Sequence, residues 1–223
     1  MSIKENLEKV TAQLPNGVRL VAVSKFHPAE DIAEAYEAGQ RLFGENRAQE
    51  LIAKAPHLPE DIRWHFIGHL QKNKVRAIMP YVSVIESIDS VKLLQLVEKE
   101  AARIDRTVDV LLQLHVAQEE TKSGFSIDEV LEAGEAGALT ENLPHVRVCG
   151  VMAMASLTDD MEQVAEEFDL VRRTYLTLKD GCFDESPYFN ELSMGMSDDW
   201  QVAVKYGATL VRIGTAIFGT REY

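Results

Sequence analysis

Short apolar runs alternate with helical patterns along this chain, and this alternation constrains the fold more than any other feature. The apolar runs lie near residues 18–24, 41–44, 63–67, 82–88, 108–116, 146–155, 188–192 and 209–214. Strands that alternate with helices predict a parallel sheet. Eight such units in 223 residues predict one (β/α)8 barrel of the TIM type over residues 1–223, near the small end of that fold's size range.

An open, doubly wound sheet is the alternative. No G-x-G-x-x-G follows the first apolar run and no P-loop pattern occurs, so a nucleotide-binding crevice lacks support. The segment from Met1 to Leu14 is polar and amphipathic, which predicts an extra amino-terminal helix and not a secretory segment.

Capping residues mark several of the predicted helices. Ser126 and Glu129 form a capping box, and Ser90 predicts another helix start. Gly39 closes a helix that begins near Pro28, whereas the segment 73–79 predicts only a weak, short helix. One long helix carries a stripe of apolar residues at helical spacing: Met161, Val164, Phe168, Val171, Tyr175 and Leu178.

The charge balance argues against several classes of partner. Lysine and arginine total 23 against 36 aspartate and glutamate residues, a net charge of −13. This charge disfavours nucleic acid as the main partner, and no apolar run is long enough to span a membrane. The two cysteines, Cys149 and Cys182, occur without a secretory signal, so we expect reduced thiols in a cytoplasmic protein.

Lys25 directly follows the first apolar run. Burial disfavours the charged ammonium, and a neutral lysine amine forms Schiff bases with aldehydes. The alternative is a side chain that extends out to water, and the segment taken alone favours that alternative. The other predicted strands favour the reactive lysine instead, because polar residues also follow them. In this fold the carboxyl ends of the barrel strands form the active site.

The last two predicted strands suggest an anion site. Ser193 supplies a hydroxyl group, and Gly214 and Thr215 offer backbone amides with little bulk around them. A phosphate site after strands seven and eight is common in this fold. The alternative for Gly214 is that it only relieves crowding inside the barrel, and the spacing leaves both interpretations open.

Arg212 and two histidines complete the polar set. Arg212 shares a strand face with Gly214 and needs a partner, which is either a ligand acceptor or a carboxylate such as Glu45. His65 and His69 are four residues apart, but no third ligand occurs at metal-binding spacing. We therefore interpret one or both of them as polar residues of the rim.

Five sequence strings, together with their order, resemble the pyridoxal phosphate homeostasis proteins, single-domain relatives of the alanine racemase barrel. The strings are Val21–Lys25, Phe43–Asn46, Trp64–Lys74, Leu192–Ser197 and Arg212–Thr215. The resemblance extends from about residue 5 to residue 219, and the strings His-Phe-Ile-Gly-His-Leu-Gln and Ser-Met-Gly-Met-Ser are highly specific.

The resemblance implies a pyridoxal 5′-phosphate (PLP) site made by Lys25, Asn46, Ser193, Arg212, Gly214 and Thr215. In this set Lys25 carries the cofactor as a Schiff base, and Ser193, Gly214 and Thr215 hold its phosphate. Arg212 faces the pyridine nitrogen and Asn46 lies near the ring, while Met154 and His65 are candidate wall residues. An arginine remains protonated, so it keeps a proton off the ring nitrogen and weakens the ring as an electron sink.

We therefore expect a PLP carrier or buffer in vitamin B6 and amino-acid homeostasis, acting as a monomer and passing PLP to apo-enzymes. A PLP-dependent racemase of low activity is the alternative. Racemisation needs acid–base groups on both faces of the cofactor, and no second base is evident beside Lys25. An aldolase-type barrel that acts on sugar phosphates is a third possibility, because fold alone does not determine chemistry.

Overall fold

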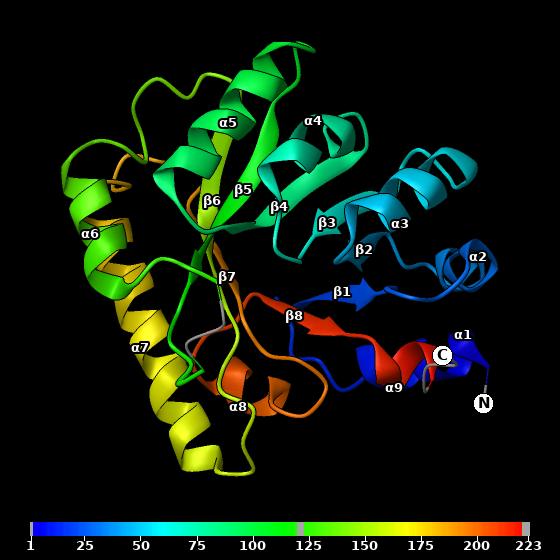
Figure 1. Cartoon of the computed structure of the whole chain (residues 1–223). Coiled ribbons are helices and arrows are strands. Elements are labelled where there is room, and N and C mark those ends of the chain that lie inside the picture. Colours follow the sequence, from blue (N-terminus) through cyan, green and yellow to red (C-terminus); the bar gives the residue numbers. More distant parts are fainter. Residues whose placement is uncertain (1, 120–122, 220–223) are drawn as a thin grey trace.

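Eight parallel strands close into a barrel in chain order, with β8 beside β1. The computed structural model describes residues 2–119 and 123–219. The strands are β1 (Arg19–Val23), β2 (Leu42–Glu45), β3 (Arg63–Phe66), β4 (Val82–Ile88), β5 (Val108–Leu114), β6 (Val146–Ala153), β7 (Glu191–Ser193) and β8 (Leu210–Ile213). Figure 1 shows helices arranged around these strands. The predicted (β/α)8 barrel is confirmed, and the open sheet is excluded.

Helices connect the strands in the described part of the chain. They are α1 (Ile3–Thr11), α2 (Ala29–Glu37), α3 (Ala48–Lys54), α4 (Val75–Ile78), α5 (Val91–Ala102), α6 (Ile127–Glu135), α7 (Met161–Asp180), α8 (Trp200–Lys205) and α9 (Thr215–Phe218), with short 3₁₀ turns at Ala55–His57 and Lys72–Lys74. The segment between β3 and β4 holds only one such turn and the four-residue α4, as its weak pattern predicted.

The predicted capping residues lie where the helices begin and end. The Ser126 hydroxyl accepts a hydrogen bond from the Glu129 amide at 3.2 Å, and the Glu129 carboxylate accepts one from the Ser126 amide at 2.8 Å. Ser90 likewise caps α5. Gly39 follows α2 with φ of +103°, a left-handed conformation that glycine adopts readily.

The amino-terminal helix packs against the last helix of the barrel. Predicted over residues 1–14, it begins with a capping box made by Ser2 and Glu5. The Asn6 side-chain amide donates a hydrogen bond to the Ile217 carbonyl at 3.0 Å, and α1 lies beside α9 in Figure 1. The first and last parts of the described fold are therefore in direct contact.

The apolar stripe on α7 is buried except at its first member. Val164, Phe168, Val171, Tyr175 and Leu178 face the core. Met161 is 40% exposed, so the stripe begins one turn later than predicted. Leu157, in the segment before α7, is also exposed, at 93%.

Apolar packing occurs in two layers. The larger layer lies between the strands and the helices, and the smaller one fills the barrel interior with Val21, Val84, Leu111, Cys149, Met152 and Leu210. Burial raises the pKa of the Cys149 thiol to about 12, so this residue is a protonated core side chain. Cys182 is also a free thiol, and neither cysteine forms a disulfide. Within the described ranges, no helix has the length and apolar character that crossing a bilayer requires.

Gly150 provides a test of how β6 and β7 pack. The pairing of β5 with β6 shifts register beside this residue, and its φ is +151°. A Cβ atom here would lie 1.8 Å from the Glu191 carbonyl oxygen. We predict that Gly150→Ala lowers the free energy of unfolding by more than about 3 kcal/mol, measured by urea denaturation.

Gly17→Ala is the matched control, because its φ is +89° and no atom lies within 4 Å of an added Cβ. The Gly17→Ala variant has the backbone strain without the clash, so its free energy of unfolding should fall by about 1 kcal/mol. An equal fall in the free energy of unfolding of the two variants would show that the close approach of β7 to Gly150 does not affect stability.

Candidate functional site

A cavity of about 500 Å³ lies at the carboxyl ends of the barrel strands. It is lined by Val23, Lys25, His27, Asn46, Ile67, Gly68, His69, Gln113, Ser123, Met154, Met196, Ser197, Asp198, Arg212, Gly214 and Thr215. These residues lie at the ends of β1, β2, β3, β5, β6 and β8 or in the loops that follow the strands. This is the end of the barrel at which the fold forms its active sites.

The cavity brings together five of the six residues predicted for a cofactor. Lys25 and Asn46 follow β1 and β2, Arg212 lies on β8, and Gly214 and Thr215 follow β8. The residues come from the first two strands and the last strand, and they meet because β8 pairs with β1. Ser193 is the exception, and its position is described below.

Asn46 carries an unsatisfied polar atom at this cavity. Its side-chain oxygen is buried and has no hydrogen-bond partner among the described residues. The loop after β3 approaches closely, since a Cβ on Gly68 would lie 2.1 Å from the Asn46 carbonyl oxygen. A buried acceptor without a partner costs free energy, so this oxygen is suited to a ligand that carries a donor.

Arg212 is held by a chain of polar contacts inside the barrel. Its Nη1 donates to Ser193 Oγ at 2.7 Å, and its Nη2 donates to the Ala153 carbonyl at 2.8 Å. Glu86, a fully buried residue of β4, lies 3.7 Å from Arg212 Nη1. Glu45, the carboxylate named as an alternative partner for Arg212, pairs with Lys54 instead. Glu86 is the carboxylate that compensates the buried guanidinium.

Ser193 is part of that chain and does not line the cavity. Its hydroxyl donates to Glu86 Oε2 at 2.6 Å while it accepts from Arg212, and the residue is completely buried. This position differs from the phosphate-holding role expected for Ser193. Ser197, four residues later in the same motif, is the serine that lines the cavity.

His65 completes the buried chain, so of the two histidines expected for the rim it is not the one at the surface. It is 2% exposed, and its Nδ1 lies 2.6 Å from Glu86 Oε1. Because an ionised carboxylate only accepts hydrogen bonds, Nδ1 carries the proton. His69 does lie at the cavity, where its Nδ1 is 3.2 Å from Ser123 Oγ.

Gly214 lies where β1 and β8 approach each other at the cavity. It lines the cavity, and a Cβ at this position would lie 2.9 Å from the Val23 carbonyl oxygen. Glycine therefore relieves crowding between β1 and β8, and its part in holding a phosphate stays a prediction. Met154 lines the cavity wall, as the resemblance implied.

Sequence reasoning missed Glu86, His27 and Gln113. Glu86 had a signal, since it is a carboxylate within an otherwise apolar strand. His27 and Gln113 line the cavity, but nothing in their local sequence distinguishes them from ordinary loop and strand residues. No group of three or more residues able to hold a metal ion occurs in the ranges that the structure describes.

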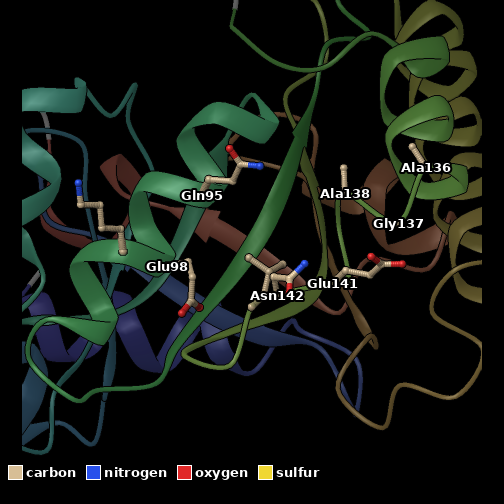
Figure 2. A pocket seen from close by; sticks show the side chains of 9 residues that line it. Gln95, Glu98, Ala136, Gly137, Ala138, Glu141 and Asn142 are labelled. Carbon is tan, nitrogen blue, oxygen red and sulfur yellow. The ribbon is translucent and has the colours of Figure 1, made fainter.

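A second hollow in the described structure lacks such an unpartnered atom. This hollow, of about 270 Å³, lies between α5 and the segment after α6, and Figure 2 shows Glu98 of α5 and Glu141 on its walls. None of the residues lining it carries an unpartnered buried side-chain atom in the described structure. The cavity at the strand ends is therefore the candidate site.

The buried chain makes a pH-dependent prediction through Glu86. Burial raises the pKa of this carboxyl group, but the hydrogen bond and charge of His65 and the charge of Arg212 outweigh that effect and hold the pKa below its usual value. A carboxylate whose pKa is lower in the folded state stabilises the protein above its unfolded pKa of about 4.3, and the contribution is lost as the pH falls through the folded value.

We therefore predict that Glu86→Gln lowers the free energy of unfolding at pH 7 by about 3 kcal/mol, because it leaves a buried guanidinium uncompensated. The difference from wild type should shrink below about pH 4.3. Urea denaturation between pH 3 and 8 measures it, with Glu8→Gln as the control on an exposed helix face. A constant difference at all pH values would contradict an ionised Glu86.

Comparison with known proteins agrees with this geometry. The family described as "Alanine racemase, N-terminal domain" matches residues 1–222. The pyridoxal phosphate homeostasis protein of Vibrio alginolyticus is 38% identical, covering 100% of this chain and 99% of that protein. Two structures of PipY from Synechococcus elongatus PCC7942 are 37% identical to this chain, and each match covers 98% of this chain and 100% of PipY. The TM-score is 0.90 for the structure without PLP and 0.86 for the structure with PLP bound. This chain therefore belongs to the pyridoxal phosphate homeostasis proteins, which are built on the alanine racemase N-terminal domain.

Proposed function

We propose that this chain binds pyridoxal 5′-phosphate with Lys25 as its covalent anchor and acts as a carrier or buffer in intracellular PLP homeostasis. One observation carries the proposal: an amine, a guanidinium and a hydroxyl group, from Lys25, Arg212 and Thr215, line one cavity. A relative named as a pyridoxal phosphate homeostasis protein and the PLP-bound structure of PipY support it.

The residues of the cavity fit such a ligand. The buried Asn46 oxygen lacks a partner within the described residues and can accept from a hydroxyl group of the ligand. Ser197 and Thr215 offer hydroxyl donors, and Gly214 offers an unobstructed backbone amide, for a phosphate group. The volume of about 500 Å³ lies within the range typical of small-molecule sites.

When bound, PLP supplies an aldehyde that condenses with an amine and a ring that withdraws electrons. Lys25 is the second residue after the end of β1, so the strand places its amine at the rim of the barrel. Arg212 stays protonated and can only donate hydrogen bonds, so it cannot accept a proton from the ring or its substituents. Glu86 and Ser193 hold the guanidinium in place. This arrangement suits retention of the cofactor better than chemistry that needs a strong electron sink.

The proposal includes transfer of PLP to apo-enzymes, in the cytoplasm and from a monomer. A carrier must release its ligand, and the cavity is bordered by loop residues such as Ser123 and Met196, of which Met196 is 37% exposed. Loops move more readily than the strands that they connect, which provides a route for release.

We predict that Lys25→Met abolishes covalent attachment of PLP while the fold is retained, because the variant has no amine at the end of β1. The measurement is borohydride reduction followed by peptide mass mapping, with Lys72→Met as the control at an exposed lysine. An adduct on another lysine in the Lys25 variant would contradict the assignment. Formation of D-alanine from L-alanine at an ordinary enzymatic rate would favour the racemase alternative.

We also predict that two serines of one motif affect binding differently. Ser197→Ala should weaken PLP binding by about tenfold but leave the binding of phosphate-free pyridoxal unchanged, because one hydrogen bond to a charged group contributes about 1.5 kcal/mol or more. Ser193→Ala should weaken the binding of PLP and of pyridoxal to the same degree, since the Ser193 hydroxyl contacts Arg212 and Glu86. Equilibrium dialysis measures both. The reverse pattern would assign the phosphate to Ser193.

A further inference from the structure

The residue after Lys25 has a strained backbone. Phe26 has φ of +69°, a left-handed conformation that non-glycine residues seldom adopt. Such a conformation persists only where the surrounding structure holds it, and these sites cluster where a side chain must be aimed. The turn that contains Lys25 is therefore held by something outside it.

The two residues that flank Lys25 are bonded to a single charged cluster. On one side, Lys54 Nζ donates to the Ser24 carbonyl at 3.1 Å. On the other side, the Phe26 amide donates to Glu50 Oε2 at 2.7 Å. Each contact fixes a peptide group next to Lys25, so together they define the direction in which its side chain leaves the backbone.

Lys54 is the centre of this cluster. Its ammonium group has three N–H donors, which reach Ser24, Glu45 Oε1 at 2.8 Å and Glu50 Oε2 at 2.8 Å. The Lys54 side chain is 11% exposed and that of Glu45 is fully buried. Glu45 also accepts from the Ser24 hydroxyl at 2.8 Å, and its second oxygen has no partner among the described residues.

The sequence builds the cluster from two elements. Glu45 is the last residue of β2, and Glu50 and Lys54 are one turn apart on α3, where an i,i+4 pair meets. Burial raises the pKa of Glu45, while the charge of Lys54 opposes this rise. Without the ammonium group, two carboxylates would face each other beside the Lys25 turn.

We propose that Lys54 is a positioning residue for Lys25: held between Glu45 and Glu50, it fixes the Ser24 carbonyl directly and the Phe26 amide through Glu50, and so maintains the left-handed conformation of Phe26. The role rests on the proposed function and deepens it. Lys54 does not line the cavity, so its effect on the ligand passes through the Lys25 turn.

Two variants and a matched control test this role. Lys54→Met removes the ammonium group, and Glu50→Ala removes the acceptor for the Phe26 amide. Lys4→Met is the control, since Lys4 also pairs with a glutamate one turn away on its helix but lies far along the chain from Lys25. If Lys54→Met does not fold, the double substitution Glu45→Gln with Lys54→Met removes both buried charges and takes its place.

The first readout needs no ligand. Amide hydrogen exchange at Phe26, followed by mass spectrometry in the PLP-free protein, should be about tenfold faster in both variants and unchanged in the control. The second readout separates attachment from binding. The rate of borohydride-trapped PLP attachment to Lys25 should fall about tenfold, while the affinity for pyridoxine 5′-phosphate, which lacks the aldehyde, stays at the wild-type value.

The outcomes distinguish the two proposals. If the wild-type protein forms no adduct on Lys25, the proposed function is overturned and the role of Lys54 falls with it. If the wild type forms the adduct but both variants keep its exchange and attachment rates, only the role of Lys54 is overturned. Equal losses of attachment and of pyridoxine 5′-phosphate affinity would also overturn it, because they indicate general loss of structure.

Discussion

The pairing of β8 with β1 is the constraint on which the rest of the structure depends. A closed parallel sheet directs the carboxyl ends of all its strands to one rim, and residues that are far apart in sequence meet there. Lys25 and Arg212 belong to opposite ends of the chain but share one cavity. An open sheet from the same elements would leave β1 and β8 as unpaired edges and separate the two residues.

Closure also brings charges into the interior, and the structure compensates each of them. Arg212 is balanced by Glu86 and Lys54 by Glu45, and in both cases the carboxylate comes from a different strand or helix. A buried charge without such a partner would be strongly destabilising. The pair of Arg212 with Glu86 lies inside the barrel at the cavity, and the pair of Lys54 with Glu45 lies beside the Lys25 turn. Stability and the geometry of the site therefore rest on the same contacts.

The sequence predicts the fold better than it predicts individual side-chain roles. Strand and helix positions follow from local periodicity and capping, as at Ser126 and Gly39, so they can be recognised from neighbouring residues alone. The expected membership of Lys25, Asn46, Arg212, Gly214 and Thr215 in one cavity agrees with the structure. Their binding of a cofactor stays a prediction.

The displaced or open assignments share one physical cause. Whether Arg212 pairs with Glu45 or Glu86, and whether Ser193 or Ser197 lines the cavity, depends on which side chains point into the barrel at a given level. Strand registers fix that level, and local sequence carries little information on them. Which of His65 and His69 lies at the rim depends on the same information, and the structure buries His65 and places His69 at the cavity.

The contact between α1 and α9 has a consequence for biosynthesis. During translation, β1 and the Lys25 turn are made before β8, Gly214 and α9. A nascent or truncated chain lacks β8, with which β1 pairs, and α9, to which the Asn6 side chain donates a hydrogen bond. The cavity can therefore form only after synthesis reaches α9, so an unfinished chain would not withdraw a reactive aldehyde from the cell.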